Sequence, residues 1–310
     1  MPEITDFYFD SSTDMNRIHA RCCVPDGEPR AVLQIAHGIS ETIDRYEDFM
    51  KFLAANGFVV VGNDHLGHGK SISSSYDKGF FASEDGWNYV IKDMMNLQYK
   101  TKEKYHGLPY VMFGHSMGSF LTRTFIIKYP DSYDAVILSG TGHQNPVVVN
   151  GGYALANLMA KTSGAHSDGQ KLNDIAFGSY LSRIENPRTK SDWLSRDNSV
   201  VDRYEADPLC GFVCTVGVYR DMMYGIKFVT DRKNIAKMNK EKPVYFMSGA
   251  EDPVGEYGKG VERAYKAFCK AGMRDVMIRL YPGGRHEMLN EINKTEVYQD
   301  ILNWLNEKLF

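Results

Sequence analysis

The chain has 310 residues, of which 43% are hydrophobic and 24% are charged, values that are ordinary for a globular protein. This length favours one large α/β domain, or a core with an inserted subdomain, and it allows a large core that needs no disulfide or metal to hold it together. The formal net charge of −3 does not predict binding to nucleic acid or to an anionic membrane surface, and we expect no nucleic-acid partner.

Cysteine usage and the N-terminal residues indicate the compartment. The chain has five cysteines, an odd number, and Cys22 and Cys23 are adjacent in an expected strand, where neighbouring side chains point to opposite faces. That is typical of free thiols in a reducing compartment; the alternative is an extracellular protein with one disulfide. Residues 1–14 lack the basic start and apolar run of a signal peptide, and no segment reaches the ~18 apolar residues of a membrane span. We therefore expect a cytoplasmic protein.

The first half of the chain alternates between short apolar runs and helical patterns. Residues 4–9 and 17–24 predict a hairpin at the edge of a sheet. An apolar run at 31–38 ends in a His-Gly break, and a second at 58–69 ends in a glycine-rich loop, with a helix predicted between them over 44–57. Further helices are predicted over 84–105 and 117–129, and strands at 110–116 and 135–140.

The alternation stops between residues 141 and 231 and then resumes. Strands are predicted at 243–252 and 275–284, each followed by a helix, over 256–271 and 295–309. Short apolar strands that alternate with helices predict a parallel sheet buried on both faces. The interruption predicts an insertion, so we divide the chain into a core of residues 1–142 and 232–310 and a cap of residues 143–231.

Two apolar stretches of this cap are rich in Val, Leu, Met and aromatic residues, at 147–160 and 209–225. Most of these residues are expected to pack the insertion on the core. Others are expected to line an apolar pocket above an active site, where the flexible methionine side chain suits chains of variable shape.

The motif Gly114-His115-Ser116-Met117-Gly118 matches the pattern G-x-S-x-G. In that pattern the serine occupies a strained turn that exposes its Oγ above the carboxyl edge of the sheet, and the glycines let strand and helix approach closely. The five-residue pattern also arises by chance, as a simple glycine-flanked turn. Here a predicted strand precedes it and a predicted helix follows it, so we predict that Ser116 is a nucleophile.

Two backbone N–H groups are candidates for binding the oxyanion of an acyl-transfer intermediate. Met117 begins a helix, so its N–H has no intrahelical partner and lies at the positive end of the helix dipole. The second donor is expected from the loop after an earlier strand, where residues 37–39 place the N–H of Ile39. A glycine turn packed by His37 is the alternative for this loop, and both readings can hold because the donor is a backbone group.

A serine nucleophile needs a base, and the base needs a carboxylate to orient it. In this architecture the chain order is serine, acid, histidine. His286 is the only histidine after Ser116 that sits between a late strand and the last helix, whereas His143 and His166 precede the expected acid. We therefore predict that His286 is the base.

Asp252 follows the predicted strand at 243–252 and is the candidate acid. Its neighbour Glu251 is the rival, but the shorter arm of an aspartate after this turn suits contact with an imidazole. The interval between Asp252 and His286 leaves room for one helix and one strand.

The segment "DHLGHGKS" raises the question of a metal, because Asp64, His65 and His68 are potential ligands at short spacing. The alternative is a glycine-rich loop whose polar residues satisfy each other and the backbone. No Cys-x-x-Cys or His-Glu-x-x-His pattern adds a ligand set. We expect such a loop, with neither a metal nor a cofactor.

With these motifs in place, the chain resembles the α/β-hydrolase superfamily over nearly its whole length, and within it the monoacylglycerol lipase and lysophospholipase group of serine hydrolases. "HGISETIDRYEDF" is similar to the H-G-x-x-E-H-x-x-R-Y segment of that group, with Glu41, Arg45 and Tyr46 in place. "DHLGHGKS" and "GHSMGS" resemble its D-H-x-G-H-G-x-S loop and nucleophile turn, and "LSRDNSVVDRYEADPL" resembles the segment leading into its cap. Thr42 departs from the pattern, because it stands where the group usually has histidine.

The resemblance implies an α/β-hydrolase fold, a mostly parallel sheet flanked by helices, with a helical cap inserted before the last two core strands. It also implies Ser116, Asp252 and His286 as the triad, Ile39 and Met117 as oxyanion donors, and a lid-like cap over an acyl-chain pocket. The departure at Thr42 bears on specificity for the glycerol side of a substrate.

These residues predict a serine hydrolase that cleaves carboxylic esters, of the monoacylglycerol or lysophospholipid type, through an acyl-enzyme. The open alternatives are a peptidase of the proline iminopeptidase type, which an acidic cluster in the cap would support, a short-chain or aryl carboxylesterase, and an acyltransferase. A non-catalytic binding protein would usually lack a member of the triad. The expected partner is a small ester or monoacyl lipid, with no nucleic acid and at most transient membrane-surface contact through the cap. Acyl-chain length, head group and oligomeric state do not follow from the sequence.

Overall fold

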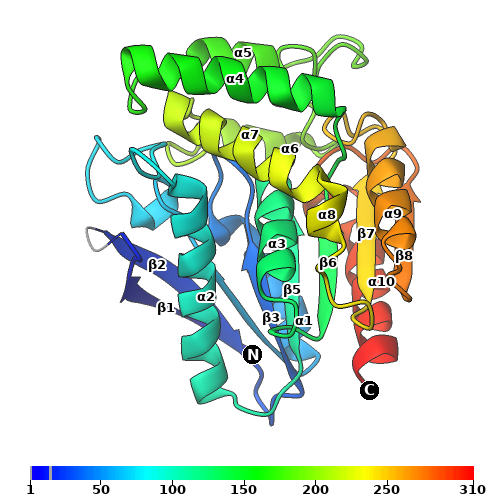
Figure 1. The fold of residues 1–310 in the computed structure, drawn as a ribbon. Helices are drawn as coiled ribbons and strands as arrows, with labels where there is room; N and C mark the ends of the chain where they lie inside the picture. Colours follow the sequence, from blue (N-terminus) through cyan, green and yellow to red (C-terminus); the bar gives the residue numbers. More distant parts are fainter. Residues whose placement is uncertain (1, 14–15) are drawn as a thin grey trace.

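The computed structural model describes residues 2–13 and 16–310, which fold around an eight-stranded sheet (Figure 1). The strand order is β1-β2-β4-β3-β5-β6-β7-β8, in which β1 and β2 form an antiparallel hairpin at one edge and β2 is antiparallel to β4. From β4 to β8 all neighbours are parallel. The strands are β1 (Glu3–Asp10), β2 (Arg17–Val24), β3 (Ala31–Ala36), β4 (Phe58–Asn63), β5 (Tyr110–His115), β6 (Ala135–Ser139), β7 (Val244–Gly249) and β8 (Val276–Tyr281).

The central strands are buried along their whole length because helices cover both faces of the sheet. One face packs on α2 (Gly86–Lys104), α3 (Met117–Lys128) and α9 (Lys259–Lys270). The other face packs on α1 (Glu47–Ala55) and α10 (Lys294–Leu309). The predicted α/β-hydrolase architecture, with a mostly parallel sheet, is therefore confirmed.

The chain between β6 and β7 is helical, as the interruption of the alternating pattern predicts. Figure 1 shows α4 and α5 as the layer farthest from the strands, with α6 and α7 between that layer and the sheet. Helix α7 packs on α4 and also on α2 and α3 of the core. The division of the chain at residues 143 and 231 stays a prediction. The helices of this segment are α4 (Pro146–Ser163), α5 (Gln170–Phe177), α6 (Asn198–Ala206), α7 (Val216–Thr230) and α8 (Arg232–Ile235).

Most predicted elements lie within a few residues of their observed bounds, and the largest differences have local causes. The helix expected over 44–57 is divided into a short 3₁₀ helix, η1 (Ile43–Tyr46), and α1. The helix expected over 256–271 begins only at residue 259, because Glu256, Tyr257 and Gly258 all have positive φ angles. Residues in that left-handed region do not continue a right-handed helix.

The five cysteines form no disulfide. Cys22 packs in the core on one face of the sheet and Cys23 in the core on the other, as their adjacent positions predict. Among residues 2–13 and 16–310, no helix combines the length and the apolar character needed to cross a membrane. The cytoplasmic location stays a prediction.

Candidate active site

Ser116 occupies a strained turn between β5 and α3. Its φ and ψ are 52° and −121°, a region that residues with a side chain rarely adopt. The turn is held by backbone hydrogen bonds: the Ser116 N–H donates to Ser139 O at 3.0 Å, and the Ser119 N–H donates to Ser116 O at 2.8 Å. This geometry matches the turn expected of G-x-S-x-G, and the serine side chain borders a cavity.

The two glycines of the motif are required by close packing. A Cβ placed on Gly114 would lie 2.4 Å from both Gly118 O and Thr122 Oγ1. A Cβ on Gly118 would lie 2.0 Å from Ala36 O, the last residue of β3. Because neither position has room for a side chain, the start of α3 can lie directly against β3 and β5.

Asp252 and His286 come together although they follow different strands. His286 Nδ1 lies 3.0 Å from Asp252 Oδ1 and donates a hydrogen bond to it. The same carboxylate accepts from Ser248 Oγ and from the Val254 N–H, each at 2.9 Å. Asp252 is fully buried, whereas its sequence rival Glu251 is exposed. The geometry brings the aspartate, and not the glutamate, to the imidazole.

The pKa shifts of Asp252 and His286 each favour the charged form of the side chain. Burial alone would raise the pKa of Asp252, but the His286 charge and the three hydrogen bonds hold it below its usual value. Burial would lower the pKa of His286, yet Asp252 and the carboxylates of Glu287 and Glu41 raise it above its usual value. Burial and the charge of His286 lower the pKa of His115 to about 4, and its ring centroid lies 4.6 Å from that of His286. The neighbouring imidazole is therefore neutral.

The predicted oxyanion loop lies directly against the serine. A Cβ placed on Gly38 would stand 3.1 Å from Ser116 Cβ, so this backbone borders the nucleophile turn. Ser40 has a positive φ of 53°, and its carbonyl accepts from the Gly211 N–H at 2.9 Å. Ile39 lines the cavity beside Ser116, and Met117 is the first residue of α3. Both predicted donors are thus placed next to the serine.

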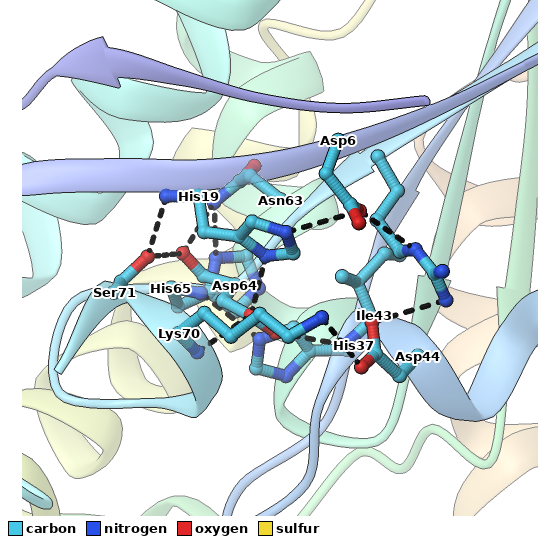
Figure 2. A network of polar contacts seen from close by, with 11 residues as sticks. Asp6, His19, His37, Ile43, Asp44, Asn63, Asp64, His65, Lys70 and Ser71 are labelled. Atoms are coloured by element: carbon cyan, nitrogen blue, oxygen red, sulfur yellow. Dashed lines mark hydrogen bonds and ion pairs between the residues drawn. The ribbon is translucent and has the colours of Figure 1, made fainter. Parts of the chain in front are cut away.

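The glycine-rich loop after β4 is hydrogen-bonded to residues on both sides of the predicted oxyanion loop. Figure 2 shows Asp64 at the centre of this network. Its carboxylate accepts from the Ile43 N–H and the Lys70 N–H at 2.9 Å and from His19 Nδ1 at 2.8 Å. Ser71 Oγ donates to Asp64 O at 2.7 Å. Asp64 therefore fixes Ile43, which follows the predicted oxyanion loop.

The rings of His37 and His68, one from each loop, are also hydrogen-bonded to the backbone. His37 Nε2 accepts from the His65 N–H at 2.9 Å (Figure 2). His37 Nδ1 donates to Gly38 O at 2.7 Å, so the two contacts together require the ring proton on Nδ1. His68 Nδ1 donates to Leu66 O at 2.9 Å, and burial lowers the pKa of His68 to about 3. Within the part of the chain that the structure describes, no group of three or more His, Cys, Asp or Glu is arranged to hold a metal ion.

A cavity of about 360 Å³ lies above Ser116 and His286. We call its core residues the floor and its residues from the segment between β6 and β7 the roof. The floor consists of Gly38, Ile39, Ser40, Glu41, His115, Ser116, His286 and Glu287. The roof consists of Gln170, Asn173, Asp174, Phe177, Gly178, Leu181, Lys190, Ser191, Trp193, Leu194, Tyr204, Gly211, Phe212 and Val213.

Several roof and floor contacts were not foreseen from the sequence. The Trp193 ring lies beside that of His286, tilted by 40° with centroids 5.0 Å apart, and the Trp193 carbonyl accepts from the His286 N–H. Arg45 joins Glu41 to Glu287 in a buried ion-pair network. The sequence motif that contains Glu41 and Arg45 could be recognised. Glu287 lies more than 240 positions after Arg45, and no local sequence pattern marks it as the partner of Arg45.

The whole chain resembles known hydrolases. The pattern of the family described as serine aminopeptidase, S33, matches residues 27–293. A monoacylglycerol lipase from Mycolicibacterium smegmatis is 27% identical over 91% of this chain and 90% of its own length. The human monoglyceride lipase is 25% identical over 96% of this chain and 89% of its own length.

Solved structures of an esterase and a lipase are also similar to this chain over nearly its whole length. A highly thermostable carboxyl esterase from Bacillus coagulans, crystallised with glycerol, superposes with a TM-score of 0.92 at 29% identity, covering 99% of both chains. A lipase in an open form superposes with a TM-score of 0.90 at 26% identity, again covering 99% of both chains. The chain therefore belongs to the serine aminopeptidase S33 family of α/β-hydrolases, and it is a carboxylic ester hydrolase.

Proposed function

We propose that the chain hydrolyses esters of monoacyl lipids, of the monoacylglycerol or lysophospholipid type, with Ser116, His286 and Asp252 as its triad. The observation that carries this proposal is the 3.0 Å hydrogen bond between His286 and Asp252 at a cavity that Ser116 also borders. The buried aspartate holds the imidazole in the tautomer whose Nε2 is free to accept a proton.

In the proposed reaction, Ser116 Oγ attacks the ester carbonyl while His286 takes its proton. The backbone N–H groups of Ile39 and Met117 donate to the oxyanion, each worth about 3 kcal/mol in the transition state. The tetrahedral intermediate collapses to an acyl-serine and expels the alcohol, which receives the proton from His286. Water, deprotonated by His286, then releases the fatty acid and restores Ser116.

The roof supports an acyl chain as the bound group. Phe177, Leu181, Trp193, Phe212 and Val213 give it aromatic and aliphatic surface facing the nucleophile. Relatives named for monoacylglycerol and monoglyceride hydrolysis span about nine tenths or more of this chain. These two observations favour a monoacyl lipid over a small polar ester.

The outer face of the cap supports transient contact with a lipid surface. Val147 and Val148 on α4 are 78% and 67% exposed, Leu158 is 59% exposed, and Ile175 on α5 is 71% exposed. In Figure 1 these two helices form the layer farthest from the sheet. An apolar outer layer would let the enzyme collect a substrate that is poorly soluble in water.

The structure gives less support to an aminopeptidase. Such an enzyme must bind a free α-amino group with unpaired carboxylates. Glu41 and Glu287 line the cavity but are both paired with Arg45. Asp174 is the one acidic residue among the described residues that line the roof, and a single carboxylate does not make the acidic cluster that an aminopeptidase would need there.

The test compares rates of hydrolysis across one substrate series. It contains p-nitrophenyl esters of increasing chain length, monoacylglycerols, lysophosphatidylcholine and a prolyl amide, with the Ser116→Ala variant as the control. We expect kcat/KM to rise with acyl-chain length, to be highest for a monoacyl lipid, and to vanish in the variant. A preference for acetyl or aryl esters would contradict the lipid substrate but keep the mechanism. Cleavage of the prolyl amide in preference to every ester would favour the aminopeptidase.

A further inference from the structure

We propose that Glu41, Arg45 and Glu287 form an ionic brace that positions the oxyanion loop relative to the base and stabilises the protonated His286. The inference rests on the proposed triad and assigns positioning roles to three residues outside it. They lie on separate parts of the chain: Glu41 follows β3, Arg45 is in η1, and Glu287 follows β8.

Glu41 holds the proposed oxyanion loop through three hydrogen bonds. Its Oε1 accepts from the Gly38 N–H and from Tyr46 Oη, and its Oε2 accepts from Arg45 Nη1 at 2.8 Å. Gly38 precedes Ile39, whose N–H is a proposed oxyanion donor. The carboxylate therefore fixes the peptide next to the donor.

Arg45 connects this loop to the base. Its Nη1 and Nη2 donate to the two carboxylate oxygens of Glu287, each at 2.6 Å, in a bidentate pair. A bidentate pair fixes orientation as well as distance, which a single contact does not. Glu287 directly follows His286, and its own N–H donates to Leu194 O at 2.8 Å. The position of the base and that of the oxyanion loop are thus set by the same guanidinium.

The brace is sheltered from water. The side chains of Arg45, Glu41 and Glu287 are 12%, 5% and 4% exposed. The ring of Tyr204 from α6 lies over the guanidinium, 4.8 Å from its centroid to Arg45 Cζ. Because screening by water is weak at such a site, these interactions count for more than an exposed ion pair would.

The brace carries one positive and two negative charges, so a net charge of −1 lies beside the base. Asp252, Glu287 and Glu41 are the carboxylates with the largest effects on His286, and the neutral His115 lies beside it. Burial opposes ionisation of Glu287, but Arg45 lowers its pKa to about 2, so this charge is present at every working pH. The excess negative charge stabilises the imidazolium that forms when Ser116 attacks.

Glu41 and Glu287 also line the cavity, so an alternative is direct contact with the hydroxyl groups of the leaving alcohol. A contact of that kind would act on glycerol esters and mainly on KM. A positioning role would act on any ester, including one without hydroxyl groups, and mainly on kcat.

The experiment compares four variants, Glu287→Gln, Arg45→Lys, Ser116→Ala and Asp221→Asn, on p-nitrophenyl butyrate and on a monoacylglycerol. Glu287→Gln removes a charge and keeps the shape of the side chain, so we expect kcat to fall about tenfold on both esters. The acid limb, by which we mean the fall of kcat/KM toward low pH, should move down by about half a pH unit because the imidazolium is less stabilised. Arg45→Lys keeps the charge but loses the bidentate pair, so kcat should fall while the acid limb stays in place.

Asp221→Asn is the matched control, because Asp221 is a buried, arginine-paired carboxylate that does not line the cavity. It should leave the rates and the acid limb unchanged. An unmoved acid limb in Glu287→Gln, or a loss confined to the KM of the monoacylglycerol, would overturn the brace. Circular dichroism checks folding, and if Glu287→Gln does not fold, Glu41→Gln provides the same charge test. Activity that survives in Ser116→Ala would instead refute the proposed triad.

Discussion

The floor and the roof of the cavity differ in how their side chains are held. On the floor, Glu41 accepts three hydrogen bonds, and Asp252, which holds the floor residue His286 from below the cavity lining, also accepts three. In the roof, Phe177 and Trp193 are held mainly by ring contacts, with centroids 6.2 Å apart. Farther out, α4 and α5 present exposed apolar residues to solvent (Figure 1).

This difference separates two tasks. Acyl transfer requires fixed donors and a fixed proton acceptor, and directional polar contacts supply that rigidity. Binding acyl chains of different lengths requires apolar surface that tolerates small shifts, which non-directional packing supplies. Changes on the floor should therefore alter kcat, and changes in the roof should alter KM.

The largest effect is expected from the floor residue Ser116. Replacing it with alanine should lower kcat/KM for p-nitrophenyl butyrate by at least about 10⁴-fold, because no covalent intermediate forms. The melting temperature should stay close to that of the wild type, since the change removes one partly buried hydroxyl that borders an existing cavity. Initial rates and a thermal melt check this, and activity near the wild-type level would contradict it.

Asp252→Asn should give the next largest loss, about 10⁴-fold in kcat, because the amide favours the wrong imidazole tautomer.

In the wild type, the raised pKa of His286 predicts that kcat/KM falls with decreasing pH at a midpoint above about 6.5. The base must be neutral to act, and the lost carboxylate no longer stabilises its charged form. The midpoint should therefore move to lower pH in the variant, and a pH–rate profile that moves to higher pH would exclude this role.

Phe177→Ala tests the roof. The side chain lines the cavity and packs on Tyr180 and Trp193, so its loss removes apolar surface without touching the triad. We expect KM for a long-chain monoacylglycerol to rise about tenfold and kcat to change little. The matched measurement is the acetyl ester, which should be nearly unaffected. An equal loss of kcat on both esters would show that roof and floor are not separable.

The smallest effect is expected from Leu158→Ser, at an exposed position of α4. The residue is 59% exposed, so the free energy of unfolding should change by no more than about 0.5 kcal/mol. Hydrolysis of a dissolved ester should be unchanged, while hydrolysis of dispersed monoacylglycerol should decrease if this face meets the lipid surface. If the variant hydrolyses dispersed monoacylglycerol as fast as the wild type does, membrane contact through α4 is contradicted.

Much of the site below the cavity could be predicted, because short sequence motifs and the order of serine, acid and histidine along the chain indicate its residues. Strand, glycine-flanked serine and helix follow one another around Ser116, and acid and histidine follow in sequence after late strands. Parallel strands bring such loops to one edge of the sheet, so chain order is enough to name Ser116, Asp252 and His286 as candidates.

The brace and the roof could not be predicted in this way. The pairing of Arg45 with Glu287 depends on η1 lying beside the loop after β8, a fact of tertiary packing. In the roof, apolar patterns indicate buried faces but do not say whether Phe212 or Trp193 faces the core or the cavity. The left-handed turn before α9 could not be predicted from the sequence either, because glutamate and tyrosine, here Glu256 and Tyr257, rarely adopt positive φ angles.

The most direct test of the central claim is to locate the covalent adduct formed with a fluorophosphonate. The protein is labelled, its intact mass is measured, and the modified peptide is sequenced by mass spectrometry. One adduct on Ser116 is expected, with labelling much slower in Asp252→Asn and absent in Ser116→Ala. An adduct on another residue, or full hydrolysis by a chain that cannot be labelled, would contradict the assignment of Ser116 as the nucleophile.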